Sequence, residues 1–287
     1  MTDIRTILHQ TTRVLDESGS PSPRLDAEVL LMHLLKTDRL QLLTHSEKIL
    51  TETEVAGYAL WVERRCQGEP VAYIVGEKEF WSLRFEVNRE VLIPRPETEC
   101  LIEEVLGRSA KEADEPRIID IGTGSGAIGV VLAREIPTAR VVATDISGGA
   151  LEIARRNAIR YGVADRMEFI QGDLCATATG VFEIIVSNPP YIPDGAYPLL
   201  PEGIRAFEPR QALIAGPDGT AFHRRIIREG AHRLKAGGWI FLEIGEGQRG
   251  LVEALFIETG VYEEIRFRMD YGGIERVAIA RRKQEED

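Results

Sequence analysis

The sequence contains few residues of the kinds that build disulfide frameworks or metal sites. Its 287 residues include three cysteines, Cys66, Cys100 and Cys175, with no CxxC pair among them. This odd number and wide spacing fit free thiols in a reducing compartment better than a disulfide framework. The five histidines show neither an HExxH motif nor paired-ligand spacing, so no metal site is expected.

The sequence also lacks a long apolar run and a recognisable targeting segment. None of its apolar stretches reaches the length needed to span a membrane. The first residues, MTDIRTILHQTTRVLDESG, carry Asp3, Asp16 and Glu17, whereas a secretory signal has an unbroken apolar segment and a transit peptide has few acids. We therefore expect a cytoplasmic protein without a membrane partner.

Positive charge is in the minority. Lys and Arg total 35 against 46 Asp and Glu, which gives a formal net charge of −11 at pH 7. A surface of that sign repels a phosphate backbone, so we expect no DNA partner. Hydrophobic residues make up 44% of the chain and charged residues 28%, ordinary values for a protein with a buried core. The length favours two domains or one enlarged α/β domain.

The first third of the chain changes character once. Up to residue 68, apolar residues recur at helical spacing, and Thr51 with Glu54 forms a capping-box pattern. Beyond it, Val71–Val75 and Phe80–Val87 are rich in β-branched and aromatic residues, which predicts strands of a short hairpin region. The predicted domains are a helical domain over residues 1–68, a β-hairpin linker over 69–93, and a third domain over 94–287.

The third domain alternates strand-like and helix-like segments. This alternation is typical of an α/β fold with a parallel sheet. Thr98 is placed to cap the first helix. No helix separates the last two strands, which predicts an antiparallel hairpin at the sheet's edge. The expected strands are Arg117–Ile121, Arg140–Thr144, Met167–Ile170, Phe182–Ser187, Trp239–Ile244, Glu264–Arg268 and Glu275–Ala280.

A glycine-rich turn, Asp120-Ile121-Gly122-Thr123-Gly124-Ser125-Gly126, follows the first of these strands. Its glycines allow a tight turn and close approach of the backbone to a ligand at a helix N-terminus. Asp145 ends the next strand, where it can accept hydrogen bonds from ribose hydroxyls or cap a helix. Asp173, after the third strand, could accept from an adenine amine or be a solvated loop carboxylate. These features predict an adenosine-containing cofactor, either a nicotinamide dinucleotide or S-adenosylmethionine.

The fourth strand ends in Ser187-Asn188-Pro189-Pro190-Tyr191 at the same edge of the sheet. The prolines have no N–H, so the turn is stiff and its carbonyl oxygens stay available, while the Asn188 amide offers a further acceptor. Two acceptors and an aromatic ring fit the planar NH2 group of an amide or a nucleobase. An ordinary Asn-Pro turn is the alternative, but the position at a strand end beside the cofactor crevice favours the amine slot.

Together these motifs resemble those of class I S-adenosylmethionine-dependent amino-methyltransferases. The glycine-rich turn, Asp145 and Asn188–Tyr191 carry this resemblance. Further segments resemble the peptide chain release factor glutamine methyltransferases, and they extend from the first helices to the last strand. These segments are Arg24–Glu28, Gly68–Ile74, Ile93–Glu99, Phe207–Pro209 and Glu275–Val277.

The resemblance implies an enzyme of translation termination that uses S-adenosylmethionine. Members of that family methylate the side-chain amide of the glutamine in the Gly-Gly-Gln motif of bacterial class I release factors. The implied fold is a small N-terminal helical domain and a β-hairpin linker before a Rossmann-like, seven-stranded, mostly parallel sheet. We expect the helical domain to dock the substrate and the protein to act as a monomer.

The resemblance also implies roles for individual residues. Asn188, Pro189, Pro190 and Tyr191 would be the catalytic residues that bind the glutamine amide, with Asn188 also contacting the cofactor. Leu174 would flank the adenine, at a position that is often aromatic in the family. The other residues expected to bind the cofactor are Gly122, Thr123, Gly124, Ser125, Gly126, Asp145 and Asp173.

Two other functions are compatible with the same motifs. A nucleic-acid adenine amino-methyltransferase would use the slot for an adenine amine flipped out of its stack. The acidic net charge and the lack of a basic target-reading insert count against it. The second is a non-catalytic cofactor-binding adaptor, against which the intact slot argues.

Overall fold

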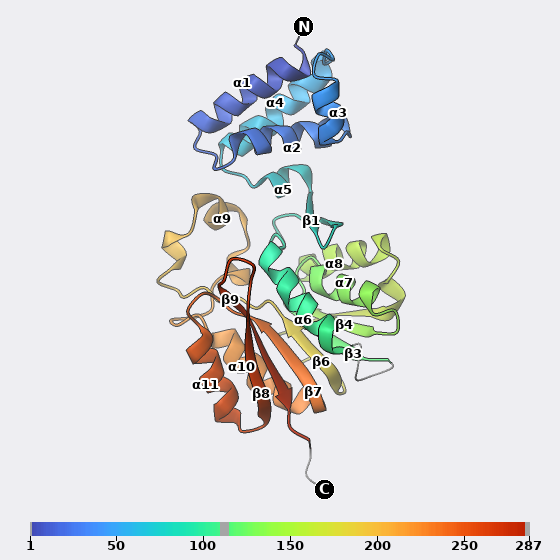
Figure 1. Cartoon of the computed structure of the whole chain (residues 1–287), viewed down its shortest axis with the longest axis vertical. Helices are drawn as coiled ribbons and strands as arrows, with labels where there is room; N and C mark the ends of the chain where they lie inside the picture. Colours follow the sequence, from blue (N-terminus) through green and yellow to red (C-terminus); the bar gives the residue numbers. More distant parts are fainter. Residues whose placement is uncertain (1, 110–114, 285–287) are drawn as a thin grey trace. The chain divides into compact units, whose positions relative to one another are not determined.

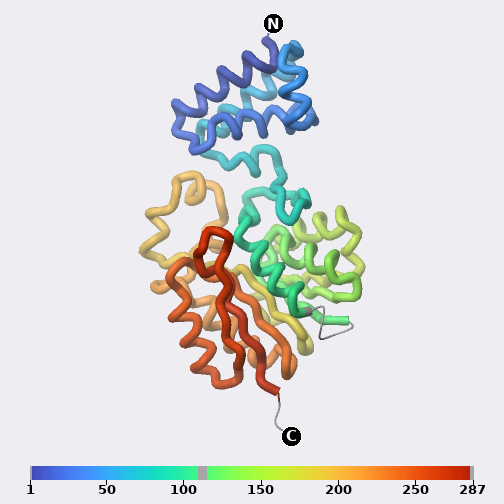
Figure 2. The backbone as a smooth tube through the Cα atoms, viewed as in Figure 1, coloured from blue at the N-terminus to red at the C-terminus, as the bar shows by residue number. Residues whose placement is uncertain are grey.

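The computed structural model of the chain, shown as a cartoon in Figure 1 and as a backbone tube in Figure 2, describes residues 2–109 and 115–284. It divides into two compact units. The first comprises Met1–Glu77 and Pro201–Phe207, and the second comprises Lys78–Leu200 and Glu208–Asp287. The first unit therefore extends past the expected boundary at residue 68 and takes a segment from the stretch assigned to the third domain. Among the described residues, none of the helices combines the length and the apolar character that a membrane span requires.

The first unit is helical, as its periodicity predicted. Its core contains Leu15, Leu30 and Leu31, which are fully buried. Thr51 and Glu54 form the predicted capping box, each side chain bonding the other's backbone N–H. The helices are α1 (Ile4–Glu17), α2 (Pro23–Leu35), α3 (Arg39–Thr44), α4 (Glu52–Cys66), α5 (Val71–Val75) and α9 (Glu202–Phe207).

Two acids of the Arg24–Glu28 segment are buried in this unit and paired. Glu28 is 3% exposed and accepts from Arg24 at 2.6 Å and from Arg39 at 2.9 Å. Asp26 is 7% exposed and accepts from Arg65 at 2.7 Å. A buried carboxylate that loses its partner is strongly destabilising, so this segment has a structural role in joining α2 to α3 and α4.

The predicted strand Val71–Val75 is wrong, because this segment is the short helix α5. Pro70 stands at its N-terminal end, and Gly76, with φ of 79°, ends it in the left-handed region that glycine tolerates. Tyr73 and Ile74 are buried. Because five apolar residues alone fit a strand or a buried helical turn equally well, the flanking Pro and Gly were the better signal.

The β-hairpin lies slightly later and belongs to the second unit from Lys78 onward. Strands β1 (Glu77–Phe80) and β2 (Leu83–Glu86) form a two-stranded sheet. Trp81 and Ser82 join them with φ of 53° and 56°, as a two-residue hairpin turn requires. Phe80 and Phe85 pack edge to face, with ring centroids 6.0 Å apart, and both join the core of the second unit.

The second unit is built on a seven-stranded sheet in the order β5-β4-β3-β6-β7-β9-β8. Strands β3 to β7 pair in parallel, whereas β9 pairs antiparallel with both β7 and β8. The predicted fold class and terminal hairpin are confirmed. The strands are β3 (Arg117–Ile121), β4 (Arg140–Asp145), β5 (Met167–Gln171), β6 (Phe182–Ser187), β7 (Leu234–Glu243), β8 (Tyr262–Met269) and β9 (Glu275–Arg282).

Helices cover both faces of this sheet (Figure 1). Helices α6 (Glu99–Ser109), α7 (Ala127–Glu135) and α8 (Gly148–Arg160) contribute to one core, and α10 (Ala221–Arg233) and α11 (Arg249–Thr259) to the other. The 3-10 turns are η1 (Pro96–Thr98), η2 (Ala164–Arg166), η3 (Tyr197–Leu199) and η4 (Arg210–Ala212).

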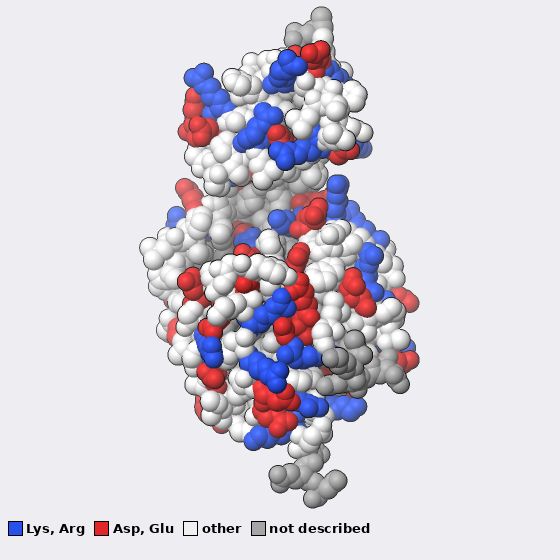
Figure 3. Space-filling view, viewed as in Figure 1, with Lys and Arg blue, Asp and Glu red and all other residues white. Residues whose placement is uncertain are grey.

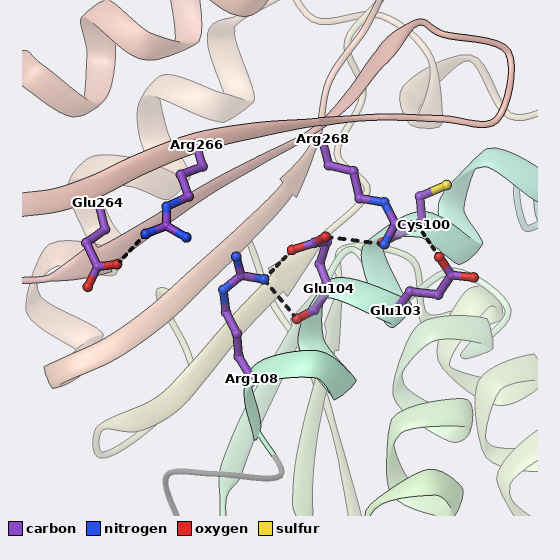
Figure 4. Close-up of polar contacts among 7 residues, drawn as sticks. All are labelled: Cys100, Glu103, Glu104, Arg108, Glu264, Arg266 and Arg268. Atoms are coloured by element: carbon purple, nitrogen blue, oxygen red, sulfur yellow. Dashed lines mark hydrogen bonds and ion pairs between the residues drawn. The ribbon is translucent and has the colours of Figure 1, made fainter.

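Ion pairs join α6 to the hairpin at the edge of the sheet (Figure 4). Arg268 on β8 pairs with Glu103 and, at 3.3 Å, with Glu104. Arg108 pairs with Glu104 one turn along the helix. All four side chains are partly buried, which protects the pairs from solvent. These contacts hold α6 against the sheet.

Candidate active site

A cavity of about 210 Å³ opens where the carboxyl ends of β3, β4 and β6 meet. Its walls contain most of the residues predicted from the sequence to bind cofactor or substrate. Gly126 and Tyr191 are the two that do not line it. The predicted residues that do are Gly122, Thr123, Gly124, Ser125, Asp145, Asp173, Leu174, Asn188, Pro189 and Pro190.

The glycine-rich turn is held against β4 by its backbone. The N–H groups of Gly122 and Thr123 both donate to the Thr144 carbonyl, at 2.8 and 2.9 Å. Gly122 and Gly124 have φ of 68° and 55°, and a Cβ added at either would meet nothing within 4 Å. Bare backbone therefore faces the open cavity at both positions.

Gly126 packs against a neighbouring helix and does not line the cavity. With φ of 81° it precedes α7, and an added Cβ would lie 3.1 Å from both Cα and Cβ of Ala154 on α8. It permits close packing of the turn against a helix. The sequence analysis placed Gly126 among the cofactor-binding residues, but it does not line the cavity.

Asp145 sits beside the turn with both carboxylate oxygens engaged. Oδ2 accepts from the Gly124 N–H at 2.9 Å, and Oδ1 accepts from the Ser147 N–H at 2.9 Å. Burial raises the pKa of Asp145 above its ordinary value, although these backbone bonds act in the opposite direction. Ser147 caps α8 itself by accepting from Ala150. Each Asp145 oxygen keeps a further lone pair, so the carboxylate can still accept from a ligand hydroxyl.

Asp120 is fully buried and holds the glycine-rich turn through hydrogen bonds. Its Oδ2 accepts from the Thr123 hydroxyl at 2.6 Å and from the Gly129 N–H at 3.0 Å, while Oδ1 has no partner. Burial raises the pKa of Asp120 to about 6. The carboxylate fixes the glycine-rich turn to the first turn of α7.

Asp173 reaches the cavity wall, but its carboxylate is already paired. Arg225 on α10 donates to both oxygens, at 2.9 and 3.0 Å, and about half of the Asp173 side chain is exposed. Leu174 follows it with φ of 52° and also lines the cavity. This ion pair could not be predicted from local patterns, because Arg225 lies 52 positions away.

Asn188 begins the Asn-Pro-Pro-Tyr turn immediately after β6. The preceding Ser187 anchors this strand end by donating to the Ile121 carbonyl at 2.7 Å. The Asn188 amide nitrogen donates to the Thr98 hydroxyl at 3.1 Å. Asn188, Pro189, Pro190 and Thr98 all line the cavity, so the amide faces the same space as the glycine-rich turn.

Tyr191, the last residue of this turn, is held by two hydrogen bonds away from the cavity lining. Its hydroxyl donates to Oε1 of Glu243 at 3.3 Å, and its carbonyl accepts from Gln248 at 2.8 Å. Burial, followed by the nearby Glu243 carboxyl, raises the pKa of Tyr191, so the phenol remains protonated at neutral pH. The ring supports the turn and does not line the cavity walls.

Two polar residues of this site were not predicted as functional. Glu243, at the end of β7, is 1% exposed and accepts from Thr98 at 2.5 Å. Burial raises its pKa to about 7. The predicted capping role of Thr98 is wrong, because its hydroxyl bonds Glu243 and Asn188. An acid at the carboxyl end of a central strand was the available signal for Glu243, since ligand sites form there.

The same chain architecture is found in known proteins. The model of the PrmC N-terminal domain matches residues 6–76, and that of the methyltransferase small domain matches residues 98–198. The release factor glutamine methyltransferase of Rhodopirellula baltica is 40% identical over 277 residues, covering 94% of this chain and 93% of the relative. That of Vibrio cholerae is 42% identical over 286 residues, covering 99% and 98%.

The chain belongs to the release factor glutamine methyltransferase family. A further member, from Moorella thermoacetica, is 41% identical over 283 residues, covering 98% of this chain and 99% of the relative. The resemblance seen in the sequence is thereby confirmed.

Solved structures agree on the fold of the family. A methyltransferase from Pyrococcus furiosus superposes with a TM-score of 0.54 at 19% identity, covering 78% of this chain and 98% of the other. The T. thermophilus 16S rRNA N2 G1207 methyltransferase, solved with AdoMet and guanosine, gives 0.50 at 18% identity, covering 72% and 50%. These similarities confirm the methyltransferase fold predicted for the second unit.

Proposed function

We propose that this protein transfers the methyl group of S-adenosylmethionine to the glutamine side-chain amide in the Gly-Gly-Gln motif of bacterial class I release factors. The observation that carries the proposal is that Asn188 and Pro189 line the same cavity as the glycine-rich turn and Asp145. A methyl donor and an amide acceptor would meet there. The family membership supports this choice of reaction and substrate.

The residues present fit S-adenosylmethionine. Gly122 and Gly124 leave an open cradle that any side chain would fill, next to the backbone N–H groups at the start of α7. Asp145 offers lone pairs to the two ribose hydroxyls, and Leu174 offers an apolar surface to the adenine. Asp173 would meet the adenine amine as half of an ion pair with Arg225, which makes it a weaker acceptor than a free carboxylate.

Asn188 and Pro189 hold the acceptor amide. The Asn188 side-chain oxygen and the Pro189 carbonyl each take one amide hydrogen, which turns the nitrogen lone pair toward the donor. Pro190 keeps the turn stiff, and Tyr191 supports it from behind through Glu243. Orienting two reactants in this way can contribute about 7–11 kcal/mol to lowering the barrier.

S-adenosylmethionine, when bound, supplies a sulfonium methyl group that a nitrogen lone pair can take as the C–S bond breaks and its electrons return to sulfur. The amide nitrogen gains the N–C bond and then loses one of its hydrogens as a proton. Asn188 and Pro189 hold the two hydrogens at this moment, and the N-protonated amide is acidic enough to release its proton to water. No strong base in the cavity wall is required.

The charge of the protein surface disfavours a nucleic-acid substrate. On the face drawn in Figure 3, Lys and Arg side chains lie interspersed with Asp and Glu, and the whole chain carries a net charge of −11. Non-specific affinity for a phosphate backbone comes from clustered positive charge. We further propose a cytoplasmic monomer, and the three free cysteines support a reducing compartment.

A transfer assay with methyl-labelled S-adenosylmethionine tests this function. The intact protein is offered a class I release factor and, separately, duplex DNA. We expect label in the release factor only. Label in DNA alone would favour the adenine amino-methyltransferase, and cofactor binding without any transfer would favour the adaptor.

A further inference from the structure

A chain of hydrogen bonds runs from the buried carboxyl of Glu243 to the amide of Asn188. The Thr98 hydroxyl lies 2.5 Å from Oε2 of Glu243, and the Asn188 amide nitrogen lies 3.1 Å from the same hydroxyl. The Tyr191 hydroxyl lies 3.3 Å from the other oxygen, Oε1. The three contacts link β7, η1 and the turn after β6.

The direction of these bonds follows from counting hydrogens. A threonine hydroxyl has one hydrogen, and an ionised carboxylate can only accept. When Glu243 is ionised, Thr98 therefore donates to it and can only accept from Asn188. The Asn188 amide must present its NH2 end to Thr98, which turns its oxygen, Oδ1, away from Thr98.

We propose that Glu243, acting through Thr98, is the positioning residue that keeps Oδ1 of Asn188 available to the substrate amide. This inference rests on the proposed function, because only an acceptor at this position can take a glutamine amide hydrogen. An Asn188 amide turned the other way would present NH2 to NH2 and repel the substrate. Glu243 touches neither cofactor nor substrate in this role.

Protonation of Glu243 would reverse the direction of the hydrogen bonds that link Glu243, Thr98 and Asn188. A neutral carboxyl can donate to Thr98, whose hydrogen then becomes free to bond Oδ1 of Asn188. Burial raises the pKa of Glu243 to about 7, so the ionised form dominates only in mildly alkaline solution.

The surroundings of Glu243 contain both signs of charge. Arg276 on β9 lowers its pKa, Glu97 on η1 raises it, and the Tyr191 hydroxyl donates to it. On α10, His223 bonds the Glu243 backbone carbonyl at 2.7 Å, and burial lowers the pKa of this histidine to about 4. His223 is therefore neutral over the range in which Glu243 titrates.

The first test observes the amide itself, without substrate. In ¹⁵N–¹H spectra of the intact protein, the Asn188 side-chain signal is assigned by its loss in Asn188→Ala. In the wild type at pH 8, we expect one amide hydrogen to be shifted downfield and protected from exchange by its bond to Thr98. The signal should move with a midpoint near pH 7, and Thr98→Val should abolish both the protection and the titration.

The second test measures single-turnover methyl transfer to a release factor. Glu243→Gln keeps the shape of the side chain. Because the Tyr191 hydroxyl donates to Oε1, the glutamine oxygen should take that position and its NH2 group should face Thr98. The NH2 group then donates to Thr98, which reverses the direction of the hydrogen bonds to Asn188. We expect this variant and Thr98→Val to react about tenfold or more slowly, with cofactor affinity changed less than about threefold. Thr98→Ser, which keeps the hydroxyl, should recover most of the rate. Thr259→Val, which removes a hydroxyl that bonds the Phe256 carbonyl within α11, is the matched control.

The pH profile distinguishes positioning from a general structural role. The wild-type rate should rise with pH through a midpoint near 7, and Glu243→Gln should be slow and lack that rise. Wild-type rates and an unchanged Asn188 signal in both Glu243→Gln and Thr98→Val would overturn the inference. A wild-type protein that transfers no methyl group would contradict the proposed function instead, and the amide spectrum would still decide the orientation of Asn188.

Discussion

The Thr98 hydroxyl lies 2.5 Å from Oε2 of Glu243, although 145 positions separate the two residues in the chain. The contact brings η1, which immediately precedes α6, to the carboxyl end of β7, where the Thr98 hydroxyl also accepts from Asn188. The ion pairs of Arg268 with Glu103 and Glu104 hold α6 to the sheet edge. The residues proposed to orient the acceptor amide are therefore held in a fixed position. Such support is what precise orientation of a reacting amide requires.

Replacing Asn188 by Ala should remove most of the methyl-transfer rate and leave S-adenosylmethionine bound. The side chain serves the acceptor amide more than the cofactor, so the loss should appear in single-turnover kinetics and not in calorimetric affinity. Asn88→Ala, which removes a side chain bonded to the Glu90 N–H in an exposed turn, is the control. A cofactor affinity that fell as steeply as the rate would make Asn188 chiefly a cofactor ligand.

Asp145→Asn should show the opposite profile. The variant keeps the size of the side chain but replaces one acceptor oxygen by a donor, so Gly124 or Ser147 and one ribose hydroxyl compete for fewer lone pairs. An unsatisfied buried hydrogen bond costs about 1–3 kcal/mol, which predicts a marked loss of cofactor affinity in calorimetry. Unchanged affinity would remove Asp145 from the cofactor site.

The strand pattern and the strand-end motifs were readable from the sequence because they are local. Apolar runs placed β3 and β6 at their observed bounds, and parallel topology brought their carboxyl ends together. Residues following those ends were therefore expected in one crevice, where the cavity lies. The strand predicted over Val71–Val75 was wrong because five consecutive apolar residues have no clear periodicity.

The polar partners of the site were beyond sequence reasoning. Arg225 pairs with Asp173, and Glu243 pairs with Thr98, across 52 and 145 positions. Neither pairing leaves a local pattern, because it depends on which strand and helix ends become neighbours. The chemistry of Asn188 was predictable from its motif, but the group that orients it was not.

Glu243→Gln should gain stability relative to the wild type as the pH rises. The ordinary pKa of a glutamate is 4.5 and burial raises that of Glu243 to about 7, so between these values the native state holds a proton that the unfolded state has lost. The free energy of unfolding of the wild type therefore falls through this range, by on the order of 3 kcal/mol from this group.

Urea unfolding of both proteins at several pH values isolates this contribution, because other groups titrate alike in each. The difference in free energy of unfolding should change between pH 4.5 and 7 and level off outside that range. A difference that does not vary with pH would show that Glu243 is not buried as a titrating acid.

Removing residues 1–77, the N-terminal part of the first unit, should leave cofactor binding and abolish release factor methylation. The structure sets the cut at Lys78, where the second unit begins. A chain starting at Val87 would also lose Phe80 and Phe85 from the core, and each such loss costs about 3–5 kcal/mol. The protein starting at Lys78 must first show a cooperative melting transition. Normal methylation by that protein would exclude residues 1–77 as the docking element.

Methyl transfer to a release factor whose Gly-Gly-Gln glutamine is replaced by glutamate is the most direct test of the proposed function. The replacement keeps the size of the side chain and removes both hydrogens that Asn188 and Pro189 would hold. A site built on such hydrogen bonds rejects a partner that lacks them by about 10⁴-fold or more. We predict label from S-adenosylmethionine in the natural factor and none above background in the glutamate variant. Equal label in both would contradict the account, because the methyl group would then go to another atom.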